Sequence, residues 1–145
     1  MRVEASVVLP APRDKVWRRL LAWELQPLWM SDAASVRVLT PHREGPGVRV
    51  AVRTMLAGVP AFTEVLEVTV WDPPRRMELA HRGFVPGFGE WILERDGNAT
   101  RFRWTERLSL PVPVLGEAVL LAYRPVMRRL MRASLRNLAD WLAGD

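Results

Sequence analysis

Four polar residues stand where the surrounding pattern predicts side chains that face an apolar interior. Glu64, His81 and Glu106 lie in segments of alternating apolar and polar residues, and Tyr123 lies on the apolar stripe of a predicted helix over 114–143. An ionised carboxylate in an apolar interior costs free energy unless its charge is compensated or its pKa rises. We therefore expect these groups to orient an apolar ligand or to serve as acids and bases.

Each of the four residues also has a purely structural interpretation. Glu106 could pair with an arginine across the sheet, or a β-bulge could turn it outward. The register of Glu64 is ambiguous because Val65 lies on the opposite face. His81 could be a hydrogen-bonded residue at a strand end, and the Tyr123 hydroxyl could bond to backbone.

Three large apolar residues, Trp91, Trp104 and Met127, complete the predicted ligand contacts. The tryptophans are expected in the core or cavity wall, and methionine adapts its shape to variable ligands. The chain has no cysteine and only two histidines, His42 and His81. We therefore expect no metal site, and no sequence motif predicts a cofactor.

Seven segments of alternating residues predict β-strands over 2–9, 35–39, 48–54, 62–71, 76–82, 90–95 and 100–110. Short turns, such as Asp-Gly-Asn at 96–98, imply antiparallel neighbours. Between the first two strands, Pro12 begins a short helix, and Pro27 separates it from a second one that ends near Met30.

Residues 114–143 predict one long helix with an apolar side and a basic side. The apolar stripe comprises Leu120, Tyr123, Met127, Leu130, Met131, Leu138 and Trp141. The opposite side carries Arg124, Arg128, Arg129, Arg132 and Arg136. A long helix after a run of strands buries its apolar side on their sheet. If that sheet curves, a mostly apolar gap can remain between sheet and helix.

Two features predict where an entrance to such a gap would lie. Pro125 removes a backbone donor within the helix, which gives either a simple kink or a hinge for the segment before it. The glycine-rich segment 83–89 is expected to be a bend, with Phe84 and Phe88 as the apolar lips of the entrance.

The totals favour one domain over 1–145 and a cytoplasmic protein. No apolar run approaches the length of a membrane span, and residues 1–4 do not resemble a secretory leader. The net charge of +5 is almost all arginine, with Lys15 the single lysine. We interpret the basic helix side as solvated, and we expect no nucleic-acid partner. Contact with an anionic membrane stays open, as does the choice between monomer and homodimer.

In the order and spacing of several short motifs, the chain resembles the START-like, or SRPBCC, superfamily of helix-grip proteins, in particular its polyketide cyclase/dehydrase and lipid-transport group. The motifs are VVLPAP at 7–12, VW at 16–17, QPLW at 26–29, GPGV at 45–48, VTVWDPPRR at 68–76, WIL at 91–93, DG at 96–97, TRF at 100–102 and the last helix through Leu138. The resemblance implies an α+β helix-grip fold: a curved antiparallel sheet of about seven strands around the C-terminal helix.

Three functions are compatible with these patterns. The first is binding, transport or sensing of a hydrophobic small molecule, such as a lipid, isoprenoid or polyketide, in a cavity between sheet and helix. The second is a cyclase or aromatase that uses the same cavity, with Glu106 or His81 as acid or base. The third is an interaction module that presents the basic helix side. The sequence favours binding over catalysis because no pair of catalytic groups is forced together.

Overall fold

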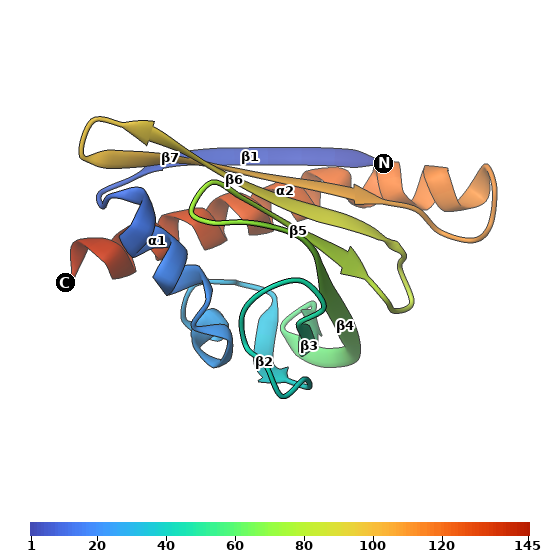
Figure 1. The fold of residues 1–145 in the computed structure, drawn as a ribbon. Helices are drawn as coiled ribbons and strands as arrows, with labels where there is room; N and C mark the ends of the chain where they lie inside the picture. The colour runs from blue at the N-terminus through green and yellow to red at the C-terminus, as the bar shows by residue number, and fades with distance from the viewer.

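The sheet and the long helix form the α+β helix-grip arrangement that the sequence predicts. The computed structural model describes residues 1–145, and its seven antiparallel strands follow the order β1-β7-β6-β5-β4-β3-β2 (Figure 1). The strands are β1 (Arg2–Leu9), β2 (Ala33–Val38), β3 (Arg49–Leu56), β4 (Val59–Asp72), β5 (Arg76–His81), β6 (Gly87–Asp96) and β7 (Ala99–Leu108). The helices are α1 (Arg13–Leu20), the short 3₁₀ helix η1 (Trp23–Leu28) and α2 (Leu115–Ala143).

The hairpin between β3 and β4 extends further than the alternation predicted. Ala57 and Gly58 both have positive φ values, 52° and 79°, which is the backbone of a type I′ turn. Such a turn matches the twist of antiparallel strands, so pairing continues to Leu56 and Val59. The alternation of apolar and polar residues did not indicate this extension, because Pro60 and the register shift beside it interrupt the period of two.

The predicted bend over 83–89 is wrong at its C-terminal end, because Gly87 already begins β6. Gly89 pairs with Glu106 of β7 and faces the interior, so Phe88 points to the opposite face of the sheet. Phe84 is 80% exposed. Neither phenylalanine forms a lip of the internal cavity described below; Val85 is the bend residue that lines it.

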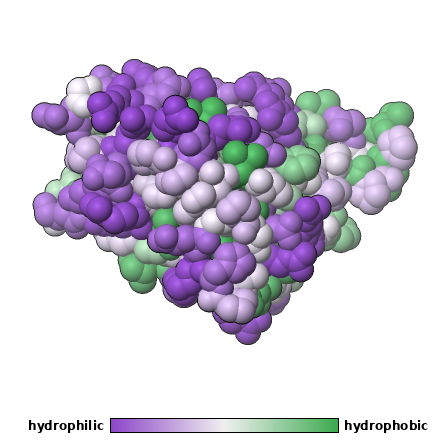
Figure 2. All heavy atoms as spheres, viewed as in Figure 1, coloured by the Kyte–Doolittle hydropathy of each residue, from purple (hydrophilic) through white to green (hydrophobic).

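Helix α2 runs unbroken through Pro125 and is anchored mainly by its second half. Five of its buried residues, Met131, Ser134, Leu135, Leu138 and Leu142, follow the proline, whereas only Gly116 and Leu120 precede it. The loop before α2 and its first turns carry exposed apolar side chains and project from the body of the molecule, at the right of the view in Figure 2. The two halves of α2 therefore differ in how firmly they are held.

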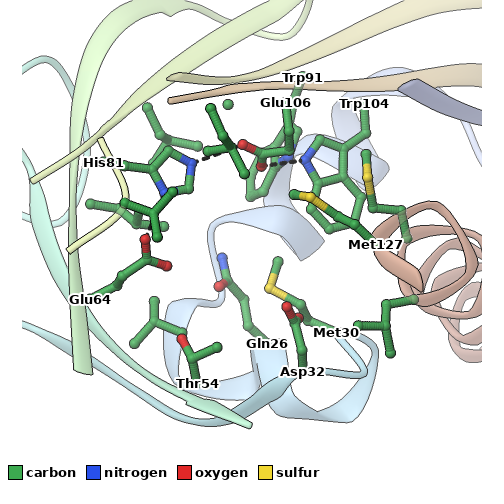
Figure 3. Close-up of a pocket in the computed structure, with 18 of the residues that line it drawn as sticks. Gln26, Met30, Asp32, Thr54, Glu64, His81, Trp91, Trp104, Glu106 and Met127 are labelled. Atoms are coloured by element: carbon green, nitrogen blue, oxygen red, sulfur yellow. Dashed lines mark hydrogen bonds and ion pairs between the residues drawn. The ribbon is translucent and has the colours of Figure 1, made fainter. Parts of the chain in front are cut away.

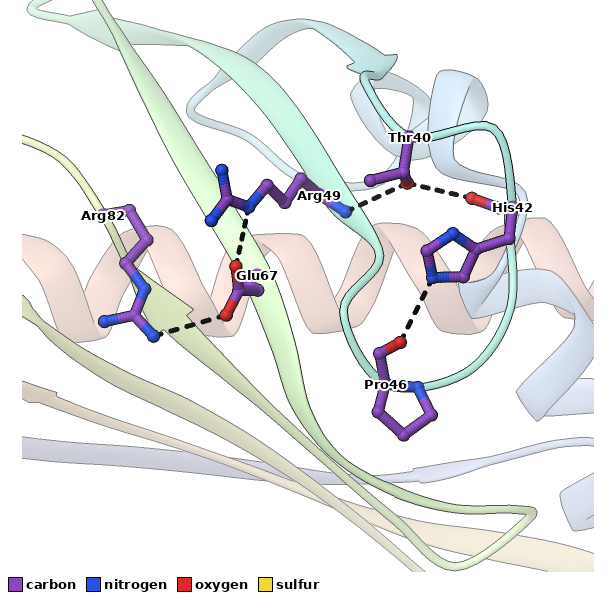
Figure 4. A network of polar contacts seen from close by, with 6 residues as sticks. All are labelled: Thr40, His42, Pro46, Arg49, Glu67 and Arg82. Carbon is purple, nitrogen blue, oxygen red and sulfur yellow. Dashed lines mark hydrogen bonds and ion pairs between the residues drawn. The ribbon is translucent and has the colours of Figure 1, made fainter.

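The outer face of the sheet is polar and joined by ion pairs (Figure 4). Glu67 on β4 accepts hydrogen bonds from Arg49 at 2.6 Å and from Arg82 at 3.3 Å. In the loop between β2 and β3, His42 donates from Nε2 to the Pro46 carbonyl at 3.1 Å. His42 thus has a local role in shaping this loop, far from the interior.

The five arginines on the predicted basic side of α2 are not equally exposed: Arg124 and Arg128 are half-buried, and Nε of Arg124 is buried without a hydrogen-bond partner. Arg129, Arg132 and Arg136 are exposed, and none of these three is within salt-bridge distance of an acidic side chain. No helix of the chain is both long enough and apolar enough to cross a membrane.

Candidate functional site

A cavity of about 170 Å³ lies between the inner face of the sheet, η1 and α2. Of its 22 lining residues, 15 are hydrophobic, which makes the wall predominantly apolar. A single buried water needs only about 15 Å³ on the same measure of volume. The cavity is therefore more than a packing defect, and its few polar groups become the centre of interest.

His81 lies between two carboxylates inside this cavity (Figure 3). Its Nδ1 is 3.1 Å from Oε1 of Glu64, and its Nε2 is 2.8 Å from Oε2 of Glu106. The three side chains come from β4, β5 and β7. All three are on inward positions of the alternation, which is why segments 17 and 25 residues from His81 can meet it.

Gly89 makes the contact between His81 and Glu106 possible, because β6 separates their strands. A Cβ atom on Gly89 would lie 2.8 Å from Oε1 of Glu106 and 3.2 Å from its Oε2. The missing side chain thus leaves room for the Glu106 carboxylate above β6. This requirement for glycine comes from a close approach, not from the backbone angles.

Glu64, His81 and Glu106 form a cluster whose net charge depends on whether His81 is protonated. Burial alone would lower the pKa of His81, but its hydrogen bonds to Glu106 and Glu64 outweigh burial and raise the pKa to about 10. His81 is therefore an imidazolium at neutral pH, with both ring nitrogens donating. A permanently protonated histidine is a poor general base, but it holds two acidic side chains together.

Trp104 fixes the second oxygen of Glu106. Two residues apart on β7, the two side chains share a face, and the Trp104 indole N–H donates to Oε1 of Glu106 at 2.8 Å. Trp29 packs edge-on against Trp104, with ring centroids 6.1 Å apart. Glu106 is therefore bonded through both oxygens, whereas only Oε1 of Glu64 has a partner in the cluster.

A second set of polar groups, Gln26, Asp32 and Thr54, lies on the wall that faces the cluster (Figure 3). Gln26, on η1, is 1% exposed, and it lines the cavity. Burial raises the pKa of Asp32 to about 6, and the negative charges of Glu106 and Glu64 act in the same direction. Asp32 is therefore poised to exchange a proton near neutral pH.

The structure places all seven predicted ligand contacts on the cavity wall, namely Glu64, His81, Trp91, Trp104, Glu106, Tyr123 and Met127. Tyr123 is half-buried; burial raises the pKa of its phenol, and the charge of Asp32 adds to this. Glu106 is neither paired with an arginine nor turned outward by a bulge. The inward register of Glu64 is the one that the structure adopts.

Sequence reasoning missed Gln26, Asp32 and Gly89. A signal for Gln26 existed: Trp23 and Gln26 are three residues apart, which puts both on one face of a 3₁₀ helix, and both are buried. Asp32 lies in a turn immediately before β2, where no periodicity indicates direction. No group of three or more His, Cys, Asp or Glu side chains is arranged to hold a metal ion.

A curled antiparallel sheet closed over a C-terminal helix, with an apolar cavity between them, defines the helix-grip class of proteins. Within that class, the chain belongs to the family described as polyketide cyclase/dehydrase and lipid transport, whose model matches residues 1–142. The resemblance read from the sequence motifs is thus confirmed at the level of the family.

Solved structures with the same fold span nearly the whole chain. A Thermus thermophilus protein, TTHA0849, is 21% identical, with a TM-score of 0.81 and coverage of 99% of this chain and 98% of that one. The ZhuI aromatase/cyclase of a Streptomyces species is 22% identical, with a TM-score of 0.79 and coverage of 99% and 93%. A START superfamily protein of Mycobacterium smegmatis is 17% identical, with a TM-score of 0.64 and coverage of 99% and 94%.

These identities support a common fold and do not transfer a substrate. A comparison with curated protein sequences finds no match.

Proposed function

We propose that the protein binds a hydrophobic small molecule in the cavity between the sheet and α2, as a carrier or sensor. The observation that carries the proposal is the composition of the wall: 15 hydrophobic side chains surround a few convergent polar groups. Small-molecule sites commonly combine an apolar wall with a small number of placed polar groups. The family, whose description includes lipid transport, supports the same interpretation.

The seven residues predicted from sequence are proposed as ligand contacts with distinct tasks. Trp91, Trp104 and Met127 supply apolar area, whereas Glu64 and Tyr123 offer hydrogen-bonding atoms. His81 and Glu106 are hydrogen-bonded to each other, so their task is to fix the position of the charged side chains on the cavity wall.

Native mass spectrometry of the gently purified protein tests this function, together with titration by naphthalene. We expect either a co-purified apolar ligand or saturable naphthalene binding that changes the fluorescence of the wall tryptophans. Leu66→Trp fills the cavity and should abolish binding, because Leu66 lies on its wall. Leu56→Trp is the matched control, because Leu56 is 51% exposed and does not line the cavity. Failure of every apolar probe to bind the folded wild-type protein would contradict the proposal.

A second candidate is a cyclase or aromatase, and Asp32 is the observation that favours it. A carboxyl whose pKa lies near 6 can both accept and donate a proton at neutral pH. In such an enzyme Asp32 is a better acid–base group than His81, whose pKa is raised to about 10. Asp32→Asn should then abolish turnover of a polyketide-like substrate while leaving its affinity within a fewfold; unchanged turnover would exclude this role.

A further inference from the structure

The cavity has an unusual distribution of charge for such an arginine-rich chain. The protein has 21 lysine and arginine residues, yet none lines the cavity. Three carboxylates, Glu64, Glu106 and Asp32, face it instead, with His81 as the single cationic partner. When all three carboxyl groups are ionised and His81 is protonated, the wall carries more negative than positive charge.

His81 has no donor left for a ligand. Its two N–H groups point to Oε1 of Glu64 and Oε2 of Glu106 at 3.1 and 2.8 Å. An imidazolium has only these two donors. A ligand carboxylate or phosphate therefore meets no free cation in the cavity, and it lies beside acidic side chains.

The charged atoms that remain free are carboxylate oxygens, whereas Gln26, Thr54 and Tyr123 add neutral groups that can both donate and accept hydrogen bonds. Oε2 of Glu64 has no side-chain partner, and the Asp32 carboxylate accepts a hydrogen bond from its own backbone N–H but none from another side chain. Gln26 is 1% exposed as a residue, and its amide points into the cavity (Figure 3). An unpaired buried acceptor costs free energy, and a donor on the ligand removes that cost.

We infer that the cavity selects ligands that present a hydrogen-bond donor, such as a phenol, an alcohol or an amine, and excludes carboxylates and phosphates. The inference rests on the proposed binding function and specifies its ligand class. Apolar area supplies most of the affinity, while the carboxylates of Glu64 and Asp32 decide which polar end is accepted. A free fatty acid would have to leave its charge uncompensated beside like charges, which is the costly arrangement.

Three probes with one apolar body test the inference by isothermal titration calorimetry at pH 7.5: 2-naphthol, 2-(aminomethyl)naphthalene and 2-naphthoate. We expect the alcohol and the amine to bind on the order of tenfold more tightly than the carboxylate, because the carboxylate must lie beside the like charges of Glu64 and Asp32. Naphthoate that binds as tightly as the other two would overturn the inference and leave the binding function intact.

Two variants locate the selectivity. Asp32→Asn and Glu64→Gln each remove one negative charge from the cavity wall. Each variant should reduce the ratio of the affinity for the amine to the affinity for naphthoate by about tenfold. Asp32→Asn breaks no side-chain hydrogen bond, so it remains informative if Glu64→Gln disturbs folding. Glu94→Gln is the matched control, because Glu94 is exposed and pairs with Arg103 outside the cavity.

The remaining outcomes are equally decisive. Selectivity that neither Asp32→Asn nor Glu64→Gln changes would overturn the assignment to these carboxylates. Failure of all three probes and of naphthalene to bind would reject the proposed function, and the inference with it.

Discussion

His81 is the residue on which the charged wall of the cavity depends. Glu64 and Glu106 would repel each other across the cavity without the imidazolium between them. Removing one partner from a buried charged network leaves the other charges uncompensated, which is strongly destabilising. The same geometry makes His81 a source of pH-dependent stability.

The stability of the protein should fall as the pH rises from neutral to alkaline values. In the folded protein the pKa of His81 is raised from an ordinary 6.5 to about 10. Its contribution is therefore complete below about pH 6.5 and is lost as the pH rises through about 10. His81→Gln should lower the free energy of unfolding by about 3 kcal/mol at pH 7 and remove this part of the alkaline decline. Chemical denaturation at pH 7, 8.5 and 10 measures both effects.

His42 provides the control for this series. It is the other histidine of the chain, it is exposed, and its bond to Pro46 lies outside the cavity. His42→Gln should retain the wild-type alkaline decline. Parallel pH profiles for His81→Gln and the wild type would refute the proposed role of the cluster in stability.

At the scale of the element, β6 contributes to the site by lacking a side chain at one position. The carboxylate of Glu106 occupies the space above Gly89 and is held there by His81 and Trp104. It cannot move aside without loss of a hydrogen bond. The strand therefore does more than connect β5 to β7.

Gly89→Ala should lower the free energy of unfolding by roughly 2 kcal/mol, as overpacking of a filled site does. The cost should largely disappear in a Glu106→Ala background, because the clashing atoms are then gone. A double-mutant cycle of urea denaturation measures this coupling. Simple additivity of the two costs would show that Gly89 is not required for the placement of Glu106.

The helix α2 contains two segments of unequal stability. Most of its buried residues follow Pro125, and the segment before the proline carries exposed apolar side chains. We expect amide hydrogens of residues 116–124 to exchange at least about tenfold faster than those of residues 130–141, because local opening follows packing. Hydrogen exchange with mass spectrometry measures the ratio.

The same measurement distinguishes a kink from a hinge at Pro125. If the first segment moves as a lid over the cavity, a bound naphthol should slow exchange before the proline and leave it unchanged after it. Equal, strong protection of both segments in the free protein would contradict both the gradient and the lid.

At the scale of the whole molecule, charge is divided between two environments. Arginines pair with acids on the outer face of the sheet, as Arg49 and Arg82 do with Glu67, and Arg129, Arg132 and Arg136 of α2 are exposed to solvent. The interior receives carboxylates and a single histidine. The net charge of +5 therefore reflects the side chains on the exterior, whereas the side chains that line the cavity are mainly acidic among the charged ones.

The local pattern of the sequence determined the strands and the long helix and indicated that His81 and Glu106 face inward, whereas the register of Glu64 was settled by the structure. A strand alternates with a period of two and a helix with a period near 3.6, so a half-buried segment reveals its buried side without reference to its neighbours. That is why the order of elements and the fold class could be predicted.

Only the tertiary structure decided which of these inward groups meet. Contact between His81 and Glu106 depends on strand order and on the space above Gly89, neither of which is encoded by the period of a single strand. Asp32 and Gln26 reach the cavity from a turn and a short helix, whose directions are set by packing against the sheet and α2. The alternation in one segment indicates which of its side chains are buried. It does not indicate which side chains of different segments come into contact, and a binding site depends on those contacts.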